Sequence, residues 1–156
     1  MKIAVASDHA GFRLKELLKP AFQELGLDAE LHDLGCYDES SVDYPDFAAK
    51  VATGVAQGEY DRGILICGTG LGMAISANKV PGIRAVTVSD EFSARMSRAH
   101  NNANVLTIGE RVVGPGLAAQ IIKAWLETEF EGGRHQRRVD KMIALEESGR
   151  GRSRRE

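Results

Sequence analysis

A cysteine followed by a glycine-rich turn is the strongest chemical signal in the sequence. Cys67 ends an apolar run, 63–67, that is too short for a helix and is typical of a buried strand of a parallel sheet. The turn GTGLG follows at 68–72, and then small residues at helical spacing. Glycines let backbone N–H groups face a ligand, and a helix N-terminus adds partial positive charge. The stretch therefore predicts a binding site for an anion beside Cys67. A helix N-terminus also lowers the pKa of a thiol, so Cys67 is a candidate for a reactive cysteine.

Further polar side chains stand next to predicted strand or helix ends. They belong to the segments Asp8-His9, Tyr44, and His100-Asn101 together with Gly109 to Arg111. Ligands of open α/β sheets bind at the carboxyl edge, so we expect these segments to meet Cys67 there. Arg134 and Arg138 lie one turn apart and share a face of a C-terminal helix. Guanidinium groups suit a phosphate better than lysine ammonium groups do.

Each of these residues also has a purely structural interpretation. A buried free cysteine usually acts as a small hydrophobic residue, and Cys36, which follows no such turn, is interpreted in that way. Asp8 could cap the first helix, and His9 could be an ordinary surface histidine. Glycine-rich turns occur widely. Arg134 and Arg138 could belong to a solvated charged face, which is the interpretation given to His135 and Arg137.

The elements that must position these groups alternate between strand and helix. The predicted strands are 2–6, 29–34, 63–67, 84–88 and 105–108. The predicted helices are 12–25 with a kink at Pro20, 46–57 capped by Asp46, one ending at 79, 91–100, 116–128 and 134–147. Leu14, Leu17, Leu18, Ala21, Phe22 and Leu25 form the expected apolar face of the first helix. The alternation implies a parallel sheet covered on both faces by right-handed crossovers.

Length and composition bound the class of protein. The 156 residues make one domain with room for a core, expected over 1–147, and the basic tail 148–156 is expected to be disordered because it lacks apolar residues. A net charge of -2 gives no reason to expect nucleic acid or a membrane surface. No apolar run approaches the ~18 residues of a membrane span. Two cysteines in unlike settings indicate a reducing cytoplasm.

Six stretches together resemble one known family. They are SDHAG after the first strand, DYP in the polar loop after the second, CGTGLGM, ISANK, the run HNNANVLTIGERVVG and GGRHQRRV, and the resemblance covers about residues 1 to 147. In combination, order and spacing they resemble the B-type ribose-5-phosphate isomerases, in the family that includes the galactose-6-phosphate isomerase subunits. The resemblance implies a Rossmann-like three-layer fold with a five-stranded parallel sheet. It also implies a homodimer with active sites at its interface, and a reaction without metal or other cofactor.

The resemblance assigns roles residue by residue. Cys67 matches the catalytic base; some members carry Ser there and a Glu in the following turn, where this chain has Met73. Thr69 matches the residue that assists at the substrate oxygens, and His100 matches the acid/base that opens the sugar ring. The remaining matches are substrate contacts: Asp8 at the sugar, His9, Arg111, Arg134 and Arg138 at the phosphate, and Tyr44 and Asn101 elsewhere on the substrate.

The chemistry fits these residue types. A group of near-neutral pKa can shuttle the ring proton, and a thiolate can move a proton from C2 to C1. Backbone N–H groups around Gly68, Gly70 and Gly72 can meet the negative enediolate oxygen. The phosphate provides remote binding energy that holds C1 and C2 under the base.

Three other functions stay open from the residues alone. The substrate could be an allose, galactose or tetrulose phosphate rather than ribose 5-phosphate. The chain could be a non-catalytic module that binds a phosphorylated ligand, although such a module needs neither Cys67 nor His100. Thiol redox activity is disfavoured because no CxxC pair exists. Dimers that pair into tetramers are a further open alternative.

Overall fold

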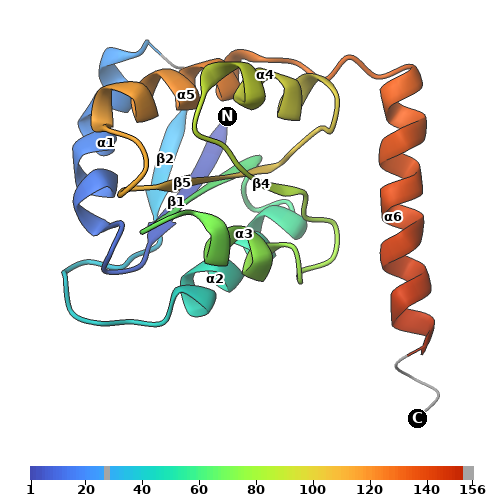
Figure 1. The fold of residues 1–156 in the computed structure, drawn as a ribbon, viewed down its shortest axis with the longest axis horizontal. Coiled ribbons are helices and arrows are strands. Elements are labelled where there is room, and N and C mark those ends of the chain that lie inside the picture. The colour runs from blue at the N-terminus through green and yellow to red at the C-terminus, as the bar shows by residue number, and fades with distance from the viewer. Residues whose placement is uncertain (27–28, 153–156) are drawn as a thin grey trace.

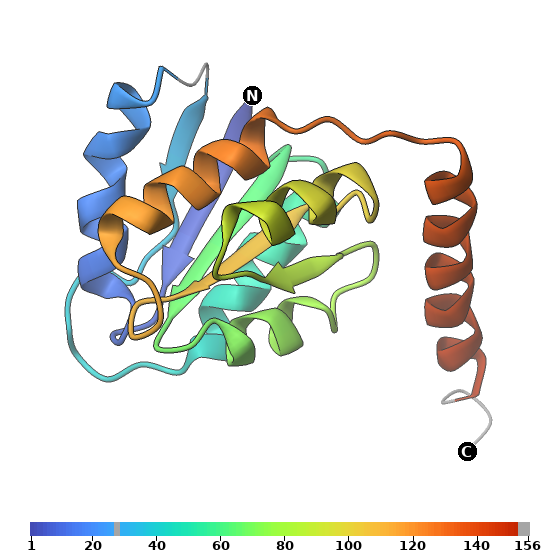
Figure 2. The ribbon, with the colours of Figure 1, turned by 45° about the horizontal axis from the view of Figure 1, so that its top comes forward.

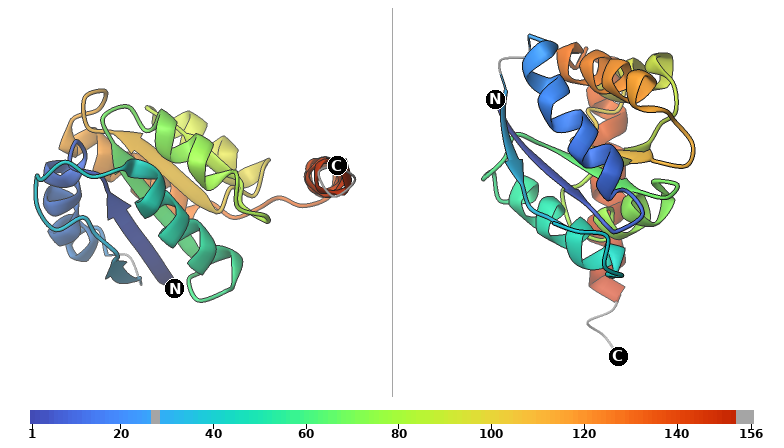
Figure 3. Two further views of the ribbon diagram at one scale, coloured as in Figure 1. Left: turned by 90° about the horizontal axis from the view of Figure 1, so that it is seen from below. Right: turned by 90° about the vertical axis from the view of Figure 1, so that its left-hand side faces the viewer.

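The computed structural model describes residues 1–26 and 29–152, and it shows a parallel sheet between two layers of helices (Figures 1 and 3). The strands are β1 (Lys2–Ser7), β2 (Glu30–Asp33), β3 (Arg62–Cys67), β4 (Ala85–Thr87) and β5 (Val105–Gly109). The helices are α1 (Phe12–Glu24), α2 (Tyr44–Ala56), α3 (Leu71–Ala77), α4 (Glu91–Ala99), α5 (Pro115–Glu127) and α6 (Arg134–Arg152). The predicted five-stranded α/β sandwich is confirmed.

The sheet has the strand order β2-β1-β3-β5-β4, and every neighbouring pair is parallel. Successive side chains of a strand point to opposite faces, so each central strand supplies two cores. Ile64 and Ile66 of β3 pack with α1, α4 and α5, whereas Leu65 and Cys67 pack with α2 and α3. Every residue of β3 is buried, which is why its sequence reads as a continuous apolar run.

Helices α1 and α2 differ from the sequence-based expectation. Helix α1 continues through Pro20, but Leu17 on its predicted apolar face is 58% exposed, while Lys15 is fully buried. Helix α2 begins at Tyr44, so Asp46 lies inside its first turn and is not the cap. The fixed φ of a proline suits the first turn of a helix, and the proline after Tyr44 therefore starts α2 earlier than a capping aspartate would suggest.

Helix α6 stands apart from the sheet at the end of an extended segment (Figures 1 and 2). It runs through Arg152, so it ends later than the predicted residue 147, and residues 153–156 of the expected disordered tail lie outside the described part. The Ser148 hydroxyl donates to the carbonyl of Leu145, so this polar residue forms a hydrogen bond inside the helix. Among the described residues, no helix has both the length and the apolar character that a membrane span requires.

Candidate active site

The carboxyl ends of β1 and β3 form the floor of a pocket. The chain leaves β1 toward β2 on one side of the sheet, while β3 leads to β5 and β4 on the other, so the two crossovers diverge here. Such a divergence leaves a crevice at the carboxyl edge of the sheet. The cavity measures about 350 Å³ and is lined by Asp8, His9, Ala10, Tyr44, Cys67, Gly68, Thr69, Gly72 and Arg111. Eight of these nine residues, all except Ala10, were predicted from the sequence as catalytic or substrate-binding.

The Cys67 thiol lies at the base of this pocket, held by the turn that follows it. Its Sγ accepts a hydrogen bond from the Gly70 N–H at 3.1 Å, and the residue is 5% exposed. Gly70 has a φ of 80°, which a residue with a Cβ rarely adopts, so a glycine is needed to turn the amide toward the sulfur. The Leu71 N–H points to the Thr69 hydroxyl at 3.4 Å. The turn thus orients the sulfur and the threonine toward one cavity.

Asp8 and His9 are fixed by backbone amides at the end of β1. The Asp8 carboxylate accepts bonds from the N–H groups of Ala10 and Gly11, at 3.0 and 3.1 Å, so it stabilises the turn before α1. It does not cap that helix, because the N-cap is Gly11 and no side chain caps it. The Val42 N–H donates to Nδ1 of His9 at 3.2 Å. A neutral imidazole that accepts at Nδ1 carries its proton on Nε2. His9 is thereby left with an Nε2–H donor for a ligand.

Tyr44 and Arg111 close the pocket against the glycine turn. A Cβ placed on Gly72 would lie 2.7 Å from the Tyr44 ring, so this glycine is what lets the ring approach the turn. The Arg111 N–H donates to the carbonyl of Gly68 at 3.0 Å, and its guanidinium lies beside the same glycine. These contacts bring one cation and one aromatic ring to the mouth of the cavity.

Five predicted site residues do not line this pocket. One is Gly70, which instead holds the Cys67 sulfur through its N–H; the others are His100, Asn101, Arg134 and Arg138. The expectation that His100 and Asn101 lie at the carboxyl edge is wrong for this chain. A crossover helix runs back along the sheet, so the end of α4 returns to the amino edge, where β5 starts. Figure 2 shows the strand arrows directed away from the side on which α6 stands.

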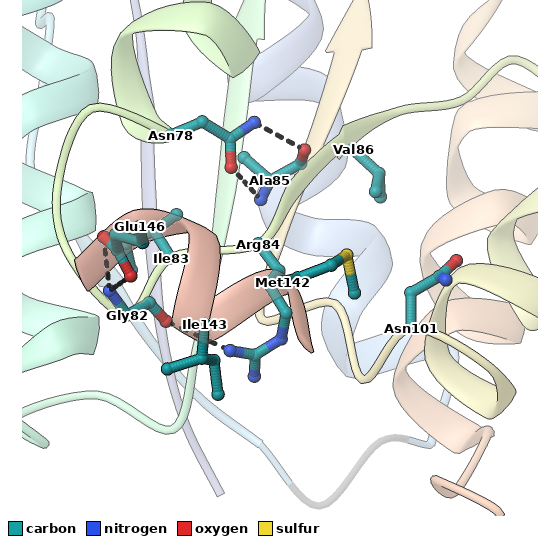
Figure 4. A pocket seen from close by; sticks show the side chains of 10 residues that line it. All are labelled: Asn78, Gly82, Ile83, Arg84, Ala85, Val86, Asn101, Met142, Ile143 and Glu146. Atoms are coloured by element: carbon teal, nitrogen blue, oxygen red, sulfur yellow. Dashed lines mark hydrogen bonds between the residues drawn. The ribbon is translucent and has the colours of Figure 1, made fainter. Parts of the chain in front are cut away.

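Asn101 instead lines a second cavity, of about 440 Å³, between α6 and the β4 region (Figure 4). Met142, Ile143 and Glu146 of α6 face it from one side, and the segment 82–86 faces it from the other. The Glu146 carboxylate accepts the Gly82 N–H at 3.2 Å. This contact and the buried Val139 tie α6 to the body of the protein.

His100 lies against the start of α6. Its ring stacks on that of His135, with centroids 4.2 Å apart and 5° between the planes. Glu131 approaches both rings through its carboxylate. Burial, together with the nearby His100 and Arg134, lowers the pKa of His135. The prediction that His135 belongs to a solvated face is wrong, because the residue is 4% exposed.

Lys15 is a supporting residue that the sequence did not indicate. Its ammonium donates to the Asp33 carboxylate at 2.7 Å and to the carbonyl of Cys36. It therefore joins α1 to the start of the loop whose Val42 amide holds His9. The sequence does not indicate that Lys15 is buried, because a lysine is ordinary in an amphipathic helix. Its acceptors come from β2 and the loop after it, which are distant in the chain.

Comparison with known proteins places the chain in a family. A family model described as Ribose/Galactose Isomerase matches residues 3–142. Ribose-5-phosphate isomerase B of Escherichia coli is 51% identical over 146 residues, covering 94% of this chain and 97% of the relative. The solved structure of Clostridium thermocellum ribose-5-phosphate isomerase B has a TM-score of 0.91 at 53% identity, covering 95% of this chain and 99% of the other.

Another similar solved structure contains a bound sugar phosphate. Ribose-5-phosphate isomerase B from Mycoplasma genitalium, with bound ribulose 5-phosphate, has a TM-score of 0.86 at 43% identity. The match covers 94% of this chain and 96% of that one. The agreement in sequence and fold extends over nearly the whole length of each protein. The chain therefore belongs to the Ribose/Galactose Isomerase family.

Proposed function

We propose that this protein is an aldose–ketose isomerase that interconverts ribose 5-phosphate and ribulose 5-phosphate through an enediolate. The observation that carries the proposal is the pocket that holds a thiol, a turn of backbone amides and a guanidinium together. The ribulose 5-phosphate bound by the Mycoplasma genitalium relative supports the choice of substrate. A pocket of this size accommodates a pentose phosphate, because small-molecule sites begin at about 300 Å³.

In the proposed mechanism, Cys67 acts as the base. Its thiolate removes the proton from C2 of the open-chain sugar and returns it to C1, so the proton and the electron pair stay within the substrate and the thiol. Amides of the turn 68–72, with Thr69, receive the charge that develops on the enediolate oxygen. Asp8 and Tyr44 contact the sugar. His9, through its Nε2–H, and Arg111 bind the phosphate.

The remaining groups are proposed to come from a second copy of the chain. His100, Asn101, Arg134 and Arg138 lie away from this chain's own pocket, yet the proposed reaction needs an acid/base for ring opening and further phosphate contacts. In a two-fold dimer, each α6 can serve the other subunit's pocket. We therefore assign ring opening to His100 of the partner subunit and phosphate contacts to Arg134 and Arg138 of the partner subunit.

Exposed apolar side chains support the dimer. Leu71 and Ile75 of α3 are 56% and 64% exposed, and Phe92 of α4 is 70% exposed. Leu71 and Ile75 lie one turn apart on the same helix, and exposed apolar side chains that stand together in this way mark protein–protein contacts. Sedimentation equilibrium measures the assembly directly and separates a dimer from a tetramer.

Both cysteines are free, which is consistent with the expected reducing cytoplasm.

Turnover of sugar phosphates tests the proposed reaction. The purified protein is incubated with ribose 5-phosphate and, in parallel, with allose 6-phosphate, galactose 6-phosphate and a tetrulose phosphate, and each ketose or aldose product is quantified. We expect ribose 5-phosphate to give the highest kcat/KM. Binding without turnover of any of the four would favour the non-catalytic module, and a higher kcat/KM on another sugar would reassign the substrate.

A further inference from the structure

Two histidines and a glutamate meet where α4, the 128–133 segment and α6 come together. His100 follows α4, Glu131 precedes α6, and His135 lies in the first turn of α6. Oε2 of Glu131 is 3.2 Å from Nε2 of His135 and 3.9 Å from Nε2 of His100. Within the described residues, these three side chains form a group of possible metal ligands, because their imidazole nitrogens and carboxylate oxygen all lie within 4.8 Å of one another.

Backbone bonds hold this cluster together without a bound ion. The Glu131 N–H donates to the carbonyl of Ala99 at 3.1 Å, next to His100. The His135 N–H donates to the carbonyl of Gly132 at 3.0 Å, next to Glu131. Each of the three side chains is therefore attached to backbone that is fixed relative to the other two, so binding of an ion requires rotation of side chains but no rearrangement of the backbone.

The donor set is that of a divalent transition-metal ion. Two imidazoles and one carboxylate suit ions such as Zn²⁺, with bonds of about 2.0–2.1 Å and donors therefore about 3.3 Å apart in a tetrahedral site. His135 is buried and fixed, whereas the side chains of His100 and Glu131 are 38% and 56% exposed and can rotate into place. Their exposure also leaves the fourth position open to water. Nε of Arg134 lies 3.5 Å from Nε2 of His135 and must turn away when an ion binds.

We propose that His100, Glu131 and His135 form a binding site for a divalent transition-metal ion such as Zn²⁺, and that an ion bound there inhibits the enzyme. The ion takes the electron pair of the His100 imidazole, the group assigned above to ring opening. Only the inhibition rests on the proposed function; binding of the ion does not. The site is thus inhibitory rather than part of the reaction, which needs no metal in the mechanism proposed above.

Binding is tested with the metal alone. Cys67→Ser protein, treated with EDTA and dialysed, is titrated with ZnCl₂ in a calorimeter, so that the pocket thiol cannot contribute. We expect one ion per chain, and binding at least ~10-fold weaker after His135→Asn or Glu131→Gln in the same background. Glu129→Gln, an exposed neighbour in the same segment, is the matched control and should bind as before. Equal affinity in all four proteins would overturn the site.

Inhibition is tested in the chain with Cys67 intact. Glu131→Gln and His135→Asn should keep the basal turnover of ribose 5-phosphate, while the Zn²⁺ concentration that halves it rises at least ~10-fold. Inhibition unchanged in both variants would place the inhibitory ion elsewhere, such as on Cys67, and would overturn the proposal. If the unaltered protein turns over no sugar phosphate, the proposed function fails, and the calorimetric titration still decides whether the metal site exists. Thermal unfolding of both variants checks that each is folded.

Discussion

The pocket at the end of β3 and the start of α6 are built in opposite ways. In the pocket, Asp8, His9 and Cys67 sit at the end of a strand or directly after it, and backbone amides of the same chain hold all three. At the start of α6, Arg134 and Arg138 follow an extended segment that leads away from the sheet (Figure 2). One chain thus brings a thiol, a turn of backbone amides and a guanidinium into its own pocket, whereas Arg134 and Arg138 lie outside that pocket and are proposed above to serve a second copy of the chain.

The largest expected effect separates the two cysteines. Cys67→Ser should lower kcat about 10³-fold, because the hydroxyl is a far weaker base than a thiolate in the same place. Cys36→Ser is the matched control, since Cys36 is equally buried but lies outside the pocket. Steady-state kinetics on ribose 5-phosphate measure both. A Cys67→Ser enzyme with near-normal kcat would remove this thiol as the base.

The second prediction tests whether α6 serves the partner's pocket. Arg134→Ala/Arg138→Ala should lower kcat/KM about 100-fold through loss of two charged phosphate contacts. Mixed with Cys67→Ser protein and allowed to exchange subunits, it should recover roughly a quarter of the normal activity, since half of the dimers then carry one intact site. Mass spectrometry verifies the exchange. No recovery after verified exchange would show that the arginines do not reach across.

A smaller effect is expected at the wall of the pocket. Gly72→Ala places a Cβ 2.7 Å from the Tyr44 ring, so the ring must move and kcat/KM should fall about 10-fold. Gly116→Ala is the control, because a Cβ there has no atom within 4 Å and alanine suits the helix. The two variants are compared by kinetics and by thermal unfolding. Equal kcat/KM in both would mean that the place of Tyr44 against the turn does not matter.

The smallest effect is expected at the end of α6. Deletion of 148–156 should leave kcat/KM and the dimer unchanged, because the contacts that tie α6 to the body, Val139 and Glu146, come earlier. Deletion of 134–156 should raise KM sharply and weaken the dimer as well. Kinetics and sedimentation compare the two deletions. A loss of activity in the shorter one would give the basic end a function that its position does not indicate.

Local sequence was sufficient for the pocket because its groups follow strands. The apolar run before Cys67 indicated a buried strand, and the glycines after it indicated a turn with free amides. Parallel strands end at one edge, so Asp8, Cys67 and Arg111 could be brought together without knowing the order of the strands. The same reasoning failed for His100, because it follows a helix, and a crossover helix ends at the opposite edge.

The sequence by itself therefore determined the α/β class, the strand that ends in Cys67 and the groups that gather around that thiol. All of these depend on periodicity and on neighbours in the chain. Only the tertiary structure decided the direction of α6, the burial of Lys15 and His135, and the approach of Glu131 to His100. The physical reason is that these features depend on contacts between distant segments. Two successive glycines with positive φ, Gly132 and Gly133, redirect the chain before α6, and the sequence showed that a break occurs there but not where it leads.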